Sequence, residues 1–150
     1  MTERSMRMLA DLDEKARPKF EDMLARLDKE LGEERYIAFE GRRSVKKQEA
    51  YHAQGREPLE KVNALRQEAG LYLLRSEQDN YMITWTLKSV HVEGLAMDIV
   101  PTDGAGEPTW DLAHFWSAYE TIRNCGRAAG LECGADWPAP KTDWPHYQIK

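Results

Sequence analysis

The feature that most restricts the fold is the stretch SVHVEGLAMDIVP, residues 89–101, which places Asp98 inside an otherwise apolar run. A bare buried carboxylate is strongly unfavourable, so Asp98 needs a partner. His91 lies seven residues earlier, and in an uninterrupted strand residues seven apart point to opposite faces. A sharp turn at Gly94 would let both side chains enter one cleft, because glycine tolerates unusual backbone angles.

The rest of the chain alternates between helical and extended patterns. Apolar residues recur at helical spacing over 5–31, 58–70 and 111–130, while Ser44 is a candidate N-cap for a helix over 45–54. Pro18 divides the first pattern into two short helices. The expected strands cover residues 36–39, 81–87, 95–100 and 146–149. We therefore predict an α+β fold with a small, mostly antiparallel sheet and helices packed beside it.

Composition excludes several classes of function. The chain has 150 residues, a typical single-domain length, with 41% hydrophobic and 31% charged residues, as in soluble globular proteins. Its net charge is −5 and it has no basic stripe, which argues against nucleic acid. We expect no membrane span and no signal peptide, and hence synthesis in the cytoplasm, where Cys125 and Cys133 would be free thiols.

His91 and Asp98 together would supply half of a tetrahedral zinc site. Among the other histidines, His52 and His114 lie in polar helical patterns, whereas His146 precedes a short strand and follows Asp143 by three residues. Three protein ligands and a water are typical of catalytic zinc, and a nearby second acid can transfer protons. The structural alternative is that His91 caps a strand, Asp98 caps a turn and His146 lies exposed in a loop. Spacing alone leaves both interpretations open.

Three blocks of the sequence resemble one family. SVHVEGLAMD resembles the S-x-H-x-x-G-x-A-x-D motif of zinc peptidases that cleave peptidoglycan stems, and DWPHYQ resembles that family's D-x-x-H segment. RRSVKKQEAYHAQGR resembles its upstream block, and ITWTLKSVH is similar to the strand before the first histidine in the endolysin branch. The family contains VanY-type D-alanyl-D-alanine carboxypeptidases and the L-alanyl-D-glutamate endopeptidases of phage endolysins. The blocks occur in family order.

The resemblance implies a set of roles, position by position. The zinc ligands would be His91, Asp98 and His146. Asp143 would be the catalytic base, and Arg43 would stabilise charge on a substrate carbonyl or carboxylate. Gln48 and Ser89 would support the site by hydrogen bonding, although by themselves Arg43 and Gln48 would pass for solvated surface residues. The chain departs from the family at two positions: the family often has arginine or histidine where this chain has Leu95, and phenylalanine where it has Tyr147.

The implied protein is a single zinc peptidase domain, with a helical extension at 1–32 and a catalytic core at 36–150 that shares the hedgehog/D-Ala-D-Ala-peptidase fold. We expect one Zn²⁺ and an L-alanyl-D-glutamate endopeptidase of phage or prophage endolysin type. It would be a monomer that degrades the cell wall after release, for which a holin-like partner is reasonable. The alternatives are a D-alanyl-D-alanine carboxypeptidase on the same site and a non-catalytic zinc-containing domain that binds cell wall.

Overall fold

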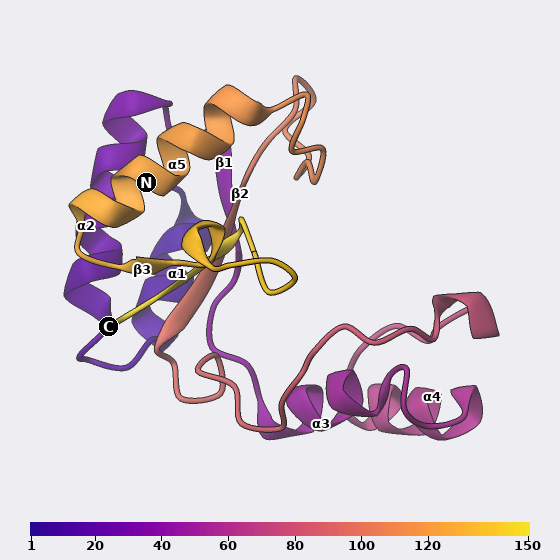
Figure 1. Ribbon diagram of the computed structural model, residues 1–150. Helices are drawn as coiled ribbons and strands as arrows, with labels where there is room; N and C mark the ends of the chain where they lie inside the picture. Colours follow the sequence, from indigo (N-terminus) through magenta and orange to yellow (C-terminus); the bar gives the residue numbers. More distant parts are fainter. The chain divides into compact units, whose positions relative to one another are not determined.

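The computed structural model describes all 150 residues, and the chain divides into two compact units (Figure 1). One unit, called here the sheet unit, comprises Met1–Arg42 and Glu93–Lys150. The other, called the helical unit, comprises Arg43–Val92. No helix in either unit combines the length and the apolar character needed to cross a bilayer.

The sheet unit contains a four-stranded antiparallel sheet in the order β1-β2-β4-β3. Its strands are β1 (Tyr36–Glu40), β2 (Ala96–Pro101), β3 (Glu132–Cys133) and β4 (His146–Gln148). The predicted α+β class with a small antiparallel sheet is confirmed. The sequence did not indicate β3, because two residues are too few to show any alternation.

Alternation along β2 decides which face of the sheet carries the core. Met97 and Ile99 are fully buried within the hydrophobic core, as is Tyr147 on the neighbouring strand. The helices that contribute to this core are α1 (Glu3–Asp11), α2 (Arg17–Glu30) and α5 (Trp116–Ala128). Figure 1 shows α2 and α5 side by side along the sheet. Asp98, between Met97 and Ile99, therefore points to the opposite face.

The ends of these helices follow local signals. Pro18 lies in the first turn of α2, so the first helical pattern does divide into α1 and α2. The predicted start of α5 was five residues too early, because the Asp111 side chain accepts a hydrogen bond from the His114 backbone N–H at 3.0 Å. Residues 112–115 form turns, and the helix begins only at Trp116.

The helical unit contains α3 (Val45–Ala53) and α4 (Leu59–Glu68), which pack on each other. Ser44 caps α3 as predicted, since its hydroxyl accepts from the Lys47 N–H at 3.1 Å. The interior of this unit is unusually polar. Arg66, only 3% exposed, donates to Gln54 Oε1 at 2.9 Å and to the Tyr72 carbonyl at 2.7 Å.

The predicted strand at 81–87 is wrong. The stretch YMITWTL has strand-like composition, but the structure pairs it with no other strand. Its side chains are exposed, with Tyr81 at 63%, Ile83 at 44% and Trp85 at 70%. Strand propensity describes side chains that suit a pleated surface, and it cannot supply the neighbouring strand.

Candidate metal site

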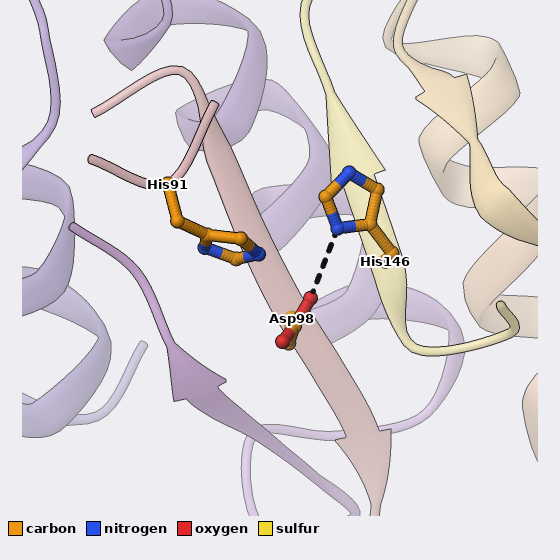
Figure 2. Close-up of side chains that lie close together, drawn as sticks. All are labelled: His91, Asp98 and His146. Atoms are coloured by element: carbon orange, nitrogen blue, oxygen red, sulfur yellow. Dashed lines mark ion pairs between the residues drawn. The ribbon is translucent and has the colours of Figure 1, made fainter. Parts of the chain in front are cut away.

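Asp98 and His146 are direct neighbours across the antiparallel pair of β2 and β4. Directly opposite residues in such a pair project from the same face of the sheet. That face lies away from the core, because Met97 and Tyr147, the next pair in the register, are buried against the helices. Asp98 Oδ1 lies 3.3 Å from His146 Nδ1, as the dashed line in Figure 2 marks. The sheet register thus joins a carboxylate to an imidazole 48 residues away in the chain.

His91 is supplied by the turn that leads into β2. Its backbone N–H donates to Ser89 Oγ at 3.2 Å, and Gly94 has a φ of +74°, as the predicted turn requires. A Cβ on Gly94 would lie 2.9 Å from the backbone nitrogen of Asp13, so this position has no room for a side chain. In Figure 2 the His91 imidazole approaches the same carboxylate from the turn.

Together, one ligand atom each from His91, Asp98 and His146 lie within 4.8 Å of one another. Both imidazoles are buried, at 3% and 6% exposure, and the carboxylate is half-buried. Burial lowers the pKa of His146, but the hydrogen bond and negative charge of Asp98 outweigh it, so the pKa is raised overall. Two imidazoles and a carboxylate are nitrogen and oxygen donors that zinc prefers. The group therefore fits a divalent metal ion.

A chain of hydrogen bonds holds the far side of the His146 ring. His146 Nε2 lies 2.8 Å from Gln148 Oε1, and Gln148 Nε2 donates to Glu132 Oε2 at 2.6 Å. A carboxylate only accepts, so the Gln148 amide nitrogen must face Glu132 and its oxygen must face the imidazole. Nε2 therefore carries a ring proton that it donates to Gln148, which leaves Nδ1 as the nitrogen that would bind a metal ion. Trp137 Nε1 donates to the other oxygen of Glu132 at 3.3 Å.

Gln148, Glu132 and Trp137 were not among the residues that the sequence predicted for the site. Gln148 stands two positions after His146, which puts it on the same side of an extended strand, and this spacing could have revealed it. Glu132 and Trp137 reach the site through the tertiary fold, and no local pattern points to them.

Asp143 is exposed and lies on the loop that leads into β4. Its backbone N–H donates to the Gly134 carbonyl at 2.9 Å, and its carbonyl accepts from the His146 N–H at 3.2 Å. A Cβ on Gly134 would overlap the Asp143 carbonyl oxygen, so the loop depends on this glycine. The negative charge of the Asp143 carboxylate also contributes to the raised pKa of His146. The backbone of Asp143 is thus fixed by hydrogen bonds to Gly134 and to His146.

Arg43 and Gln48 are joined inside the helical unit. Arg43 Nη1 donates to Gln48 Oε1 at 2.7 Å, and its Cζ lies 4.9 Å from the centre of the Tyr51 ring. Gln48 is 1% exposed and donates to the Thr86 carbonyl at 2.6 Å, so it is not the surface residue that its helical pattern alone suggested. His52 and His114 lie outside the metal-binding group.

The fold and this group of donors define the molecule as an α+β protein with a candidate site for a single metal ion. No family model matches the sequence, and no curated protein matches it. The structure is similar to the crystal structure of the Serratia marcescens L-Ala D-Glu endopeptidase ChiX, with a TM-score of 0.57 and 20% sequence identity. The match covers 100% of this chain and 89% of ChiX. The two proteins share a fold, and the expected fold class is confirmed.

Proposed function

We propose that the chain is a zinc-dependent peptidoglycan peptidase that cleaves the L-alanyl-D-glutamate bond of the stem peptide. The observation that carries this proposal is the convergence of His91, Asp98 and His146 on one small volume. The motif resemblance supports it, as does the fold shared with a protein described as an L-Ala D-Glu endopeptidase. As a monomeric enzyme of endolysin type, it would act on the cell wall after holin-dependent release from the cytoplasm.

In this proposal His91, Asp98 and His146 hold one zinc ion, which supplies a Lewis acid that lowers the pKa of water to about 7. The Asp143 carboxylate takes a proton from the attacking water and later delivers it to the departing amine nitrogen. The Arg43 guanidinium, positioned by its bond to Gln48, stabilises negative charge on the substrate carbonyl oxygen. Ser89 fixes the backbone of His91.

The test is digestion of purified sacculi followed by mass analysis of the released fragments. Cleavage of the expected bond leaves a free amine on D-glutamate, whereas a carboxypeptidase releases only D-alanine. We expect His91→Ala and Asp143→Ala to abolish cleavage, with zinc content reduced in the first variant and retained in the second. His114→Ala, which changes an exposed histidine outside the group, is the matched control.

Two outcomes would contradict the proposal in different ways. If His91→Ala and Asp143→Ala cleave as well as the wild-type protein, the assigned mechanism is wrong. If the wild-type protein binds wall fragments tightly and releases nothing, the chain is a non-catalytic binding domain.

A further inference from the structure

Trp144 stands between the two functional residues of the loop that leads into β4. It directly follows the proposed base Asp143 and comes two positions before His146, a member of the candidate metal site. The His146 backbone N–H donates to the Asp143 carbonyl at 3.2 Å, a bond that closes a four-residue turn over 143–146. One turn therefore carries the acid, the indole and the imidazole, and a displacement of this turn would move all three.

The indole of Trp144 packs on one face of α5. Its ring centre lies 5.0 Å from that of Trp116 and 6.2 Å from that of Tyr119, and Arg123 Cζ lies 5.1 Å from the indole centre. Positions 116, 119 and 123 recur at the spacing of a single helical face. Three side chains of one helix therefore hold the indole.

The face of α5 that receives the indole is anchored in the sheet unit. Ile122 is fully buried in the hydrophobic core, and Tyr119 is only 2% exposed. The Tyr119 hydroxyl donates to the Thr109 carbonyl at 2.8 Å, which ties the helix to the segment before it. Closely packed groups of this kind resist displacement. The helix therefore offers the indole a rigid surface.

The charge of Asp143 acts on both α5 and the imidazole. Burial, together with the negative charge of Asp143, raises the pKa of Tyr119 to about 12, and the same charge contributes to the raised pKa of His146. The Asp143 side chain is exposed, so its position depends largely on the backbone of the turn that carries it. Where this turn rests against α5 therefore decides where the charge lies relative to the metal-binding group.

We propose that Trp144 is a positioning residue, whose docking on α5 holds Asp143 and His146 in the geometry that zinc binding and proton transfer require. This inference rests on the proposed function and adds to it a residue that acts through two others. Precise placement matters at such a site, because a shift of about 1 Å in a catalytic group can lower a rate about 100-fold.

Zinc affinity tests the effect on His146 without any measurement of activity. Trp144→Ala removes the docked ring, whereas Trp144→Phe keeps a smaller ring that can pack on Trp116 and Tyr119. Docking can strengthen zinc binding by no more than its own free energy. In competition with a chelator, we expect Trp144→Ala to bind zinc about 2- to 13-fold more weakly, the range for one aromatic pair, and Trp144→Phe to stay within about twofold of the wild type.

Turnover tests the effect on Asp143. With a soluble tetrapeptide muropeptide and saturating zinc, kcat of Trp144→Ala should fall about 10- to 100-fold with little change in KM, because the base acts in the chemical step. Trp144→Phe should recover most of kcat. The matched control is Trp110→Ala, which removes the aromatic pair with Phe39 at 4.9 Å and should change neither zinc affinity nor kcat. Urea unfolding of the zinc-free variants measures stability, the only quantity that a purely structural role would change.

A double-variant cycle shows whether the indole acts through α5. Trp116→Ala removes one docking partner, so it should weaken zinc binding by itself but cost little further affinity when added to Trp144→Ala. Should Trp144→Ala fail to fold, Trp116→Ala provides the same comparison with the wild type. Losses of zinc affinity that simply add would contradict docking on α5.

The outcomes separate this inference from the proposed function. If Trp144→Ala binds zinc and cleaves as the wild type does, Trp144 does not position the turn, and the proposed function stands. If the wild type binds zinc but cleaves nothing, the proposed function fails, and weaker zinc binding by Trp144→Ala still supports the positioning of His146. A wild-type protein that binds no zinc overturns both proposals.

Discussion

Replacement of Gln148 by alanine would remove the group that orients His146. The wild-type contact joins His146 Nε2 to Gln148 Oε1 at 2.8 Å, and Glu132 holds the amide from behind at 2.6 Å. Without that acceptor the neutral ring can place its proton on Nδ1, the nitrogen that would otherwise bind the metal ion. Outer hydrogen bonds to metal-binding histidines are worth about 10- to 100-fold in metal affinity.

The structure places the expected loss near the lower end of that range. A single net hydrogen bond is worth about 0.5–1.5 kcal/mol, and water can replace part of it because Gln148 is only half-buried. We therefore expect Gln148→Ala to weaken zinc binding about tenfold, or about 1.4 kcal/mol. Competition with a chromophoric chelator near neutral pH measures this quantity directly, and urea unfolding of the metal-free variant reports any general loss of stability.

The hydrogen-bond chain also predicts a reciprocal pair. Gln148→Glu alone would place a carboxylate against the Glu132 carboxylate, where the wild-type amide donates, and should weaken zinc binding through that repulsion. Adding Glu132→Gln reverses the donor and acceptor and should recover most of the affinity. If Gln148→Ala binds zinc as tightly as the wild type, or the double variant recovers nothing, Gln148 does not position His146.

Further predictions concern the loop, the helical unit and the thiols. Gly134→Ala should lower the free energy of unfolding by about 1–3 kcal/mol and should also weaken zinc binding, because the added Cβ overlaps the loop leading into β4. Gly104→Ala is the control, since its Cβ meets no atom within 4 Å, and it should change neither quantity. Arg66→Met leaves the buried Gln54 Oε1 and the part-buried Tyr72 carbonyl without their donor and should expose residues 43–92 to limited proteolysis. Arg75→Met, which changes an exposed side chain, should not. Burial raises the pKa of Cys133 from 9.0 to about 11, so the native thiol should resist Ellman's reagent at pH 8. The Cys133 thiol of the unfolded chain loses its proton at a lower pH than the native thiol does, so the urea concentration at the unfolding midpoint should decrease as the pH rises from about 9 to about 11. A midpoint that does not change over this range would contradict the raised pKa of Cys133.

Local patterns were enough to predict much of the fold. Side-chain direction in a strand depends only on its period of two, so LAMDIV puts Met97 and Ile99 on one face and Asp98 on the other, and in the structure the face of Met97 and Ile99 meets the core. Gly94 was correctly predicted as a turn for the same kind of reason, since a positive φ is a property of one residue.

The same local patterns failed wherever a partner was needed. YMITWTL has the side chains of a strand, yet only the fold could decide that no strand pairs with it. Two-residue β3 owes its existence entirely to β4 beside it. Strand composition records what a segment tolerates, whereas pairing depends on what the rest of the chain brings to it.

Residue types and spacing were enough to name the donors of the candidate site: one carboxylate in an apolar strand, a histidine before a glycine turn and another histidine after a proline. The pairing of Asp98 opposite His146, and the hydrogen bonds by which Gln148 and Glu132 fix the proton on Nε2, depend on the folded chain. Residue identity and spacing act locally, whereas register and hydrogen bonds between distant segments exist only once the chain has folded.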